Sequence, residues 1–200
     1  EAAKQLKREM NIGKKKDRKK QVKYTIAYDE KYPCMSELFT GKEHLSEDIT
    51  IPSVVYKYAD KNKDCVFVFD RGVSKRKVYC DLNQKPTFFV TRLKDNFRYR
   101  AVCQLNVKNN RKTGTLEVIN DQIIQLGVPN SNQFLDYHFR LITAINPQNN
   151  VNYFFLTNLF DSEVDEVLSF YKKRWDIEVF IRFLKQELNF SHLTSTSENG

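Results

Sequence analysis

The sequence predicts a mixed α/β domain, and three observations carry this prediction. Residues 65–69 form an uninterrupted run of apolar, mostly β-branched and aromatic residues, which is typical of a strand buried on both faces in the middle of a partly parallel sheet. Three segments between residues 96 and 147 alternate polar and apolar residues, as antiparallel strands with one buried face do. The longest helical pattern of the chain then covers residues 162–188.

The elements before the apolar run are predicted to be a hairpin and a helix. Residues 21–28 and 33–39 have strand patterns and enclose a short polar turn. Residues 46–60 favour a helix that begins near Ser46, because two acidic residues follow in its first turn.

The elements after the apolar run place an antiparallel insertion inside the α/β domain. A short helix is predicted at residues 74–82 and a strand at residues 86–93. Turn-rich stretches of Asn, Gly, Ser and Pro then separate the alternating segments, so we interpret these segments as an insertion. The remaining strands are predicted at residues 98–107, 115–125, 134–145 and 151–158.

The composition is that of a globular chain. Hydrophobic residues make up 40% of the 200 residues and aromatic residues 13%, which is enough for a packed core. No apolar run is long enough to span a membrane, and the charged first ten residues lack the apolar centre of a signal peptide. We therefore expect a cytoplasmic protein with no membrane partner.

The charge balance favours a polyanionic partner such as nucleic acid, although ribosome-associated and merely soluble basic proteins share it. The chain has 33 Lys and Arg against 25 Asp and Glu, a net charge of +8, and its pI is near 9.2. Nine of the first twenty residues are basic, which fits either a solvated arm or contact with phosphates. The four cysteines include no Cys-x-x-Cys pair, which argues against a zinc knuckle.

Asp70 is the first candidate for a chemical role. It follows directly after the apolar run, and ligands of α/β sheets gather at the carboxyl ends of strands. The alternative is that Asp70 only caps the next turn, in which Gly72 allows a tight bend.

The second candidate is a charged stripe on the predicted helix 162–188. At 100° per residue, its members fall within about 80° of arc, with apolar residues on both sides. Such a stripe suits a helix that lies mostly inside the protein and lines a cleft. The alternative is a row of ion pairs between residues four apart on a solvated face. The stripe consists of Tyr171, Arg174, Glu178, Arg182 and Lys185.

These residues resemble the signature of a known family. Tyr171, Arg174, Glu178 and Lys185 have the spacing Y-x2-R-x3-E-x6-K, which resembles the YREK signature of bacterial DDE transposases of the insertion-sequence-four type. Asp70, with Arg and Gly after it, resembles the second catalytic Asp of that family. An antiparallel insertion between the two acids also fits, and the resemblance extends over about residues 21–185.

The resemblance implies a ribonuclease H-like fold and metal-dependent cleavage and strand transfer at transposon ends. By this resemblance, Asp70 and Glu178 would be catalytic metal ligands for two Mg²⁺ or Mn²⁺ ions. Tyr171, Arg174 and Lys185 would contact double-stranded DNA, with transposon ends and target as partners. A homodimer in the synaptic complex and a nucleoid-associated location would follow. For Trp175 we expect core packing, and for Arg182 a solvated charge.

The expected organisation has four parts. They are a basic segment (1–20), the first part of the ribonuclease H-like core (21–93), the antiparallel insertion (94–150) and the second part of the core with the Glu-bearing helix (151–200). No residue matches the family's first catalytic Asp, so we expect a catalytic-core fragment that lacks the first strand and is inactive alone. A non-catalytic, basic DNA-binding remnant is the main alternative. A different ribonuclease H-like nuclease, such as a resolvase, is disfavoured by the Tyr, Arg and Lys spacing.

Overall fold

The computed structural model describes residues 23–29, 31–39, 46–60, 65–85, 87–105 and 112–187. The predicted basic segment 1–20 lies outside these residues. The chain divides into two compact units, one formed by Glu1–Lys61 with Trp175–Gly200 and the other by Asn62–Arg174. None of the helices in the described ranges is long and apolar enough to cross a membrane.

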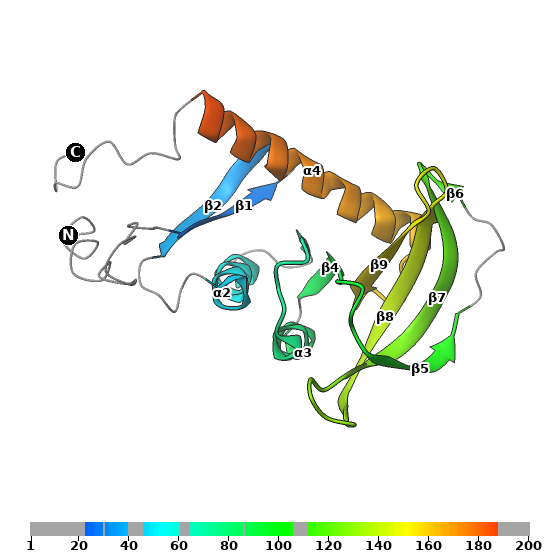
Figure 1. Ribbon diagram of the computed structural model, residues 1–200. Helices are drawn as coiled ribbons and strands as arrows, with labels where there is room; N and C mark the ends of the chain where they lie inside the picture. Colours follow the sequence, from blue (N-terminus) through cyan, green and yellow to red (C-terminus); the bar gives the residue numbers. More distant parts are fainter. Residues whose placement is uncertain are drawn as a thin grey trace, which may run out of the picture. The chain divides into compact units, whose positions relative to one another are not determined.

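The first unit contains the predicted hairpin and helix. Strands β1 (Lys23–Asp29) and β2 (Tyr32–Phe39) pair antiparallel in a sheet of their own (Figure 1). Helix α2 (Glu47–Ala59) begins where predicted, because the Ser46 hydroxyl accepts a hydrogen bond from the backbone N–H two residues later at 3.3 Å. Lys57 of α2 also forms an ion pair with Glu37 of β2 at 2.7 Å.

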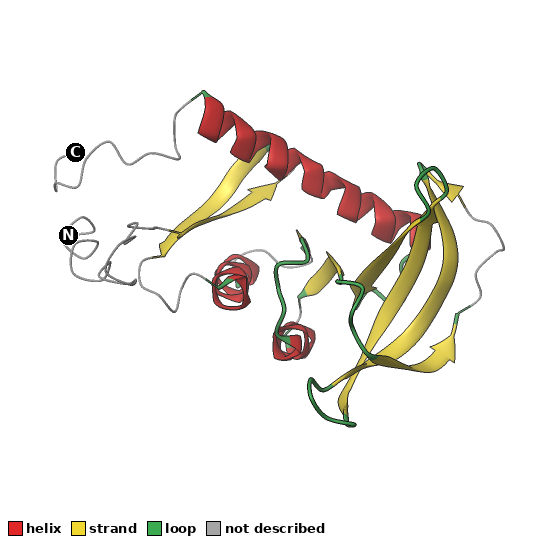
Figure 2. Ribbon diagram, viewed as in Figure 1, coloured by secondary structure: helices red, strands yellow, loops and turns green. Residues whose placement is uncertain are grey.

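The second unit is built on a mixed sheet with flanking helices, as predicted. Seven of the described strands form this sheet, and only the β3–β4 pair is parallel. Figure 2 shows the strands in yellow and the helices in red. The strand order is β3-β4-β9-β8-β7-β5, with β6 paired to β7. The strands are β3 (Val66–Phe69), β4 (Phe88–Arg92), β5 (Tyr99–Gln104), β6 (Lys112–Thr113), β7 (Leu116–Gly127), β8 (Phe134–Asn146) and β9 (Val151–Thr157). The helices are α3 (Arg76–Gln84) and the beginning of α4 (Val164–Gln186).

The predicted central position of the apolar strand is wrong. Strand β3 is at the edge of this sheet, where β4 is its partner among the described strands. Of its four residues only Phe69 is fully buried, and the other three are half-buried. An apolar run cannot distinguish an edge strand covered on its faces from a central one, because the difference lies in backbone pairing. The predicted parallel component is confirmed.

Aromatic and aliphatic side chains fill the core of the second unit. The rings of Phe69, Tyr79 and Phe89 stack with centroids 5.9–6.5 Å apart, which joins β3 and β4 to α3. On α4, Val167 and Leu168 belong to the same buried cluster as residues of β4, β8 and β9. The first turns of α4 are therefore held by packing on the sheet.

A buried ion pair lies inside this unit. Arg140 of β8 donates from Nε and Nη2 to the two carboxylate oxygens of Asp121 on β7, at 2.9 and 2.7 Å. Its Nη1 donates to the backbone carbonyls of Leu159, Phe160 and Ser162, just before α4 begins. One guanidinium thus connects two strands with the segment that leads into α4.

Candidate active site

Asp70 lies at the carboxyl end of β3. The preceding residue pairs with Thr91 of the parallel strand β4, and the Thr91 hydroxyl donates to the Asp70 carbonyl at 3.1 Å. The carboxylate is exposed, and its Oδ1 accepts a hydrogen bond from the Gly72 N–H at 2.9 Å. The turn-capping alternative therefore describes a real contact. It engages one of two carboxylate oxygens, so the same side chain could also hold a cation.

Tyr171 of α4 lies in the same unit, among charged groups. Its half-buried ring packs edge-on against Phe155, with centroids 5.0 Å apart, and the Arg174 guanidinium lies 5.4 Å from the ring centre. Burial raises the pKa of Tyr171, against the opposing effect of the charges on Arg174 and Arg92, while the Asp70 charge adds to the rise in pKa. The structure therefore brings Asp70, Tyr171 and Arg174 into one neighbourhood.

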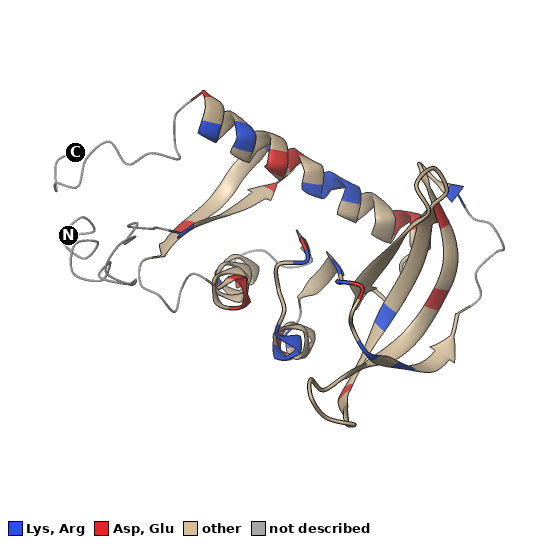
Figure 3. Ribbon diagram, in the orientation of Figure 1, with Lys and Arg blue, Asp and Glu red and all other residues tan. Residues whose placement is uncertain are grey.

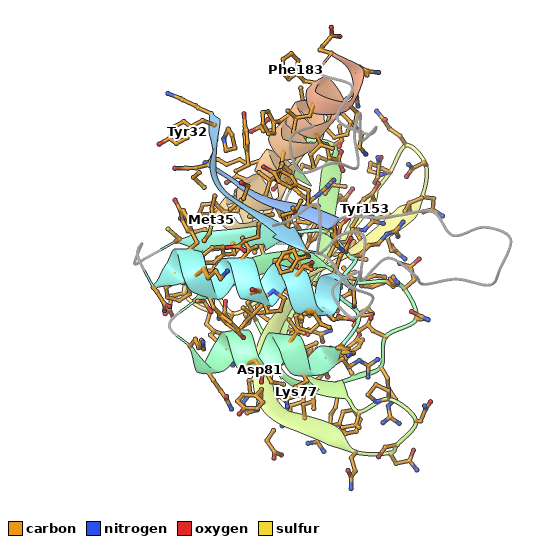
Figure 4. All side chains as sticks on the ribbon, turned by 90° about the vertical axis from the view of Figure 1, so that its left-hand side faces the viewer. Tyr32, Met35, Lys77, Asp81, Tyr153 and Phe183 are labelled. Carbon is orange, nitrogen blue, oxygen red and sulfur yellow. The ribbon has the colours of Figure 1, made fainter. Side chains whose placement is uncertain are left out.

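Arg92 is a member of this neighbourhood that the sequence analysis did not identify. It is the last residue of β4, and its guanidinium lies 4.2 Å from the centre of the Tyr153 ring (Tyr153 is labelled in Figure 4). Its Nε is buried and has no hydrogen-bond partner in the part of the chain that the structure describes. The available signal was its position, because the carboxyl ends of two adjacent parallel strands meet at one edge of a sheet.

Glu178 and Lys185 lie further along α4, which runs without interruption from Val164 to Gln186. Glu178 is half-buried and comes one turn after Arg174, on the same helix face, while Lys185 is exposed in the last turn. Figure 3 shows basic and acidic stretches alternating along this helix. Asp70 belongs to the unit Asn62–Arg174 and Glu178 to the other unit, so their roles as a pair stay a prediction.

The expectation of core packing for Trp175 is wrong. Its side chain is 53% exposed, and the guanidinium of Arg182, itself exposed, lies 5.7 Å from the centre of its ring. The apolar residues on one side of the stripe are also open, since Val179 and Phe183 are each 49% exposed. The second half of the charged stripe is therefore less enclosed than its pattern predicts.

Comparison with known families decides the classification. The model of the family described as "Transposase DDE domain" matches residues 2–200. The chain belongs to this transposase family. The prediction of a DDE transposase is confirmed at this level, while its insertion-sequence-four subdivision stays a prediction.

Two bacterial relatives agree with this classification. A protein of Geobacillus stearothermophilus, named "Probable transposase for insertion sequence element IS5377", is 27% identical over 184 residues, which cover 90% of this chain and 44% of the relative. A protein of Sinorhizobium fredii (strain NBRC 101917 / NGR234), named "Putative transposase y4zB", is 26% identical over 134 residues, 67% of this chain and 37% of the relative. The chain spans less than half the length of these curated relatives.

The chemistry of Asp70 fits the divalent metals that DDE transposases use. An exposed carboxylate at a strand end is the hard oxygen ligand that Mg²⁺ and Mn²⁺ prefer, and Glu178 offers the same group. Within the described ranges of residues 23–187, no three His, Cys, Asp or Glu side chains form a group that could hold a metal ion. The assignment of Asp70 and Glu178 as metal ligands therefore stays a prediction.

Proposed function

We propose that the chain is part of the catalytic core of an insertion-sequence-four-type DNA transposase with a ribonuclease H-like fold. The observation that carries this proposal is the arrangement around Tyr171. Asp70, at the carboxyl end of β3, and Arg174 both act on this phenol, and the same helix continues to Glu178 and Lys185 at the YREK spacing. The reaction would be cleavage and strand transfer at transposon ends, with double-stranded DNA as the substrate.

In this proposal the two carboxylates and the basic groups have separate tasks. Asp70 and Glu178 would hold divalent cations, which, when bound, activate the attacking hydroxyl and stabilise the leaving oxygen. Asp70 is prepared for this by Thr91, which fixes its backbone, and by Gly72, which orients the carboxylate through Oδ1.

Tyr171 and Arg174 would hold DNA phosphates beside the carboxylates. The phenol of Tyr171 is protonated at neutral pH, as an ordinary tyrosine is, and can donate a hydrogen bond to a phosphate oxygen. Arg174 supplies a permanent positive charge with several N–H donors, and Lys185 offers a further charge two turns beyond Glu178. To these predicted contacts the proposal adds Arg92, whose buried Nε lies in the same neighbourhood.

The finer organisation belongs to the same proposal. Residues 94–150 would be an insertion between the two parts of the core, residues 21–93 and 151–200. The first catalytic Asp and its strand would lie outside this chain, and two copies would pair the transposon ends.

The metal-ligand assignment is tested by Glu178→Gln in the complete reading frame from which the chain comes. The neutral amide keeps the shape of the side chain but is a much weaker cation ligand, so we expect Mg²⁺-dependent cleavage to be lost while DNA binding is retained. The assay measures nicking and double-strand cleavage of a plasmid that carries the element ends, alongside a mobility-shift assay. Asp176→Asn is the matched control, because it removes an exposed carboxylate two residues earlier on the same helix.

The outcomes separate the candidate functions. Loss of cleavage in Glu178→Gln, with full cleavage in Asp176→Asn, supports the assignment. Unchanged cleavage by Glu178→Gln contradicts it. A complete wild-type protein that binds DNA but never cleaves it, with any divalent metal, would instead be the non-catalytic DNA-binding remnant.

A further inference from the structure

A polar pocket lies away from Asp70, Tyr171 and Arg174 but within the same unit. Its volume is about 650 Å³. Two arginines contribute to its wall, Arg76 from the first turn of α3 and Arg98 from the segment before β5. The other lining residues are mostly amides and a hydroxyl from two loops, namely Asn96, Val128, Pro129, Asn130, Ser131 and Asn132.

The contacts of Arg98 hold this pocket together but give it no negatively charged partner among the described residues, although its guanidinium also lies 5.1 Å from the centre of the Phe134 ring. Its guanidinium donates to the backbone carbonyls of residues 128, 131 and 133, and to Oδ1 of Asn132 at 3.3 Å. All of these acceptors are neutral. Arg98 therefore fixes the loop at residues 128–133 while its positive charge remains at the pocket.

Arg76 and Arg98 both line the pocket, and their like charges act on each other. Burial lowers the pKa of Arg76, and the charge of Arg98 lowers it further, against a smaller opposing effect of Tyr79. Among the described residues, no carboxylate forms an ion pair with either arginine, including Asp95, which is next in sequence to the lining residue Asn96. Two such cations without a counter-charge repel each other, and an anion between them would relieve this repulsion.

The start of α3 adds to the positive potential. The helix has no acidic residue in its first turn, and its N-cap residue, Lys75, makes no capping side-chain hydrogen bond. Arg76 and Lys77 follow, so basic side chains lie at the end of the helix dipole where acidic ones are normally favourable. This arrangement is unfavourable in the protein alone and becomes favourable when an anion is bound.

We propose that this pocket binds a phosphodiester of duplex DNA, with Arg76 as the main contact and Arg98 as the residue that shapes the site. The inference rests on the proposed transposase function and adds a DNA contact outside the candidate active site. Arginine, asparagine and serine side chains are the groups that proteins use to contact DNA backbones, and the lining contains all three.

The chain limits how far this phosphate can lie from Asp70. The six peptide steps from Asp70 to Arg76 span at most about 22 Å when fully extended. One base pair advances the duplex by about 3.4 Å, so the bound phosphate would lie within about six or seven base pairs of the DNA held at Asp70, plus the reach of the side chains. The pocket is therefore close enough to Asp70 for one duplex to contact both.

The simpler explanation is that Arg98 is only a loop anchor and Arg76 a surface arginine. It accounts for the contacts of Arg98. It does not account for two interacting arginines in the lining of one polar pocket, neither of which forms an ion pair with a carboxylate in the described part of the chain. The two explanations differ in the effect of removing Arg76.

The test compares Arg76→Gln with Lys77→Gln in the full chain. Lys77 is the next residue and carries the same charge, but it does not line the pocket, and Figure 4 labels it with Asp81 one turn later on α3. The probe is a fluorescent duplex of about 30 base pairs, and anisotropy gives the binding constant between about 50 and 200 mM salt. We expect Arg76→Gln to bind about tenfold more weakly and to lose about 0.9 from the slope of log K against log salt. Lys77→Gln should lose much less of both, and Arg76→Lys should recover part of the slope.

A second measurement tests the position of the phosphate. Single neutral methylphosphonates are introduced within about seven base pairs of the cleavage site. At one or two positions in the DNA, the neutral methylphosphonate should weaken binding of the wild-type chain. It should not weaken binding of Arg76→Gln, because that variant has already lost the contact with this phosphate. Circular dichroism melting checks that both variants are folded.

Each outcome decides the proposal. Equal effects of Arg76→Gln and Lys77→Gln, or no position that depends on Arg76, would overturn it. A third outcome would also overturn it. If inorganic phosphate stabilised the wild-type chain but not Arg76→Gln, and both bound DNA equally well, the pocket would bind a free anion and not the DNA backbone. Failure of the proposed transposase function is recognised separately, because the complete wild-type protein would then bind duplex DNA without cleaving it, or would not bind it at all.

Discussion

The two halves of α4 differ in what surrounds them. In the first half, Val164, Val167 and Leu168 are at most 6% exposed, and they belong to the cluster that packs on the sheet. In the second half, no described side chain is fully buried, and Trp175 and Val179 are about half exposed, at 53% and 49%. Since the helix is continuous, the difference comes from the neighbouring elements and not from helix propensity.

The proposed site residues are divided between these halves. Tyr171 and Arg174 lie on the half that the sheet holds, and Glu178 and Lys185 on the half with fewer buried contacts. That second half contacts the hairpin, where the rings of Phe180 and Tyr28 lie 5.2 Å apart. The two parts of the signature, Tyr171 with Arg174 and Glu178 with Lys185, are thus stabilised by different interactions.

The largest expected effect comes from breaking the ion pair that holds the segment before α4. Asp121→Ala leaves Arg140 as a buried charge without its carboxylate, which should lower the free energy of unfolding by about 3–5 kcal/mol. Urea denaturation measures this change. Asp136→Ala, an exposed acid on the neighbouring strand, is the control and should change stability by less than about 0.5 kcal/mol. Similar values for both variants would show that the pair does not anchor this segment.

A smaller effect tests the difference between the two halves directly. Leu168→Ala removes a buried side chain and should cost about 2–5 kcal/mol, because a cavity remains in the core. Phe183→Ala removes a larger side chain that is 49% exposed, and it should cost less than about 1 kcal/mol. Both are measured in the same denaturation assay. A larger loss for Phe183→Ala would mean that the second half of α4 is packed as tightly as the first.

The smallest expected effect concerns the ionisation of Tyr171. Its pKa is raised in the folded chain, so the folded state keeps the phenol proton to higher pH than the unfolded state does. Below the ordinary tyrosine pKa of about 10, the phenol is protonated in both states and its effect on the free energy of unfolding does not depend on pH. Above that pH the unfolded chain loses the proton first, so the free energy of unfolding falls. The phenolate absorbance of wild type minus that of Tyr171→Phe should therefore titrate with a midpoint above about 10. A midpoint at or below that value would contradict the prediction and would mean that the charges of Arg174 and Arg92 outweigh the effect of burial.

Local patterns predicted most of the elements, and pairings between distant segments explain what was missed. Ser46 was identified as the start of a helix because a cap depends on its immediate neighbours. The edge position of β3 and the exposure of Trp175 depend on elements far away in sequence, about which a local pattern contains no information. Arg92 had a signal in its position at the end of a predicted strand, but its closeness to Tyr153 and Tyr171 depends on the pairing of β4 with β9.

Arg140 has a mechanical consequence for any DNA held on α4. Its guanidinium connects β7, β8 and three carbonyls of the segment before the helix, so this junction has little freedom to rotate. A force applied to Tyr171 or Arg174 would therefore be transmitted to the sheet, and the chain would not bend where the helix begins. A lysine at this position could keep the charge but not this stiffness, because a single ammonium cannot reach the same set of partners in fixed directions.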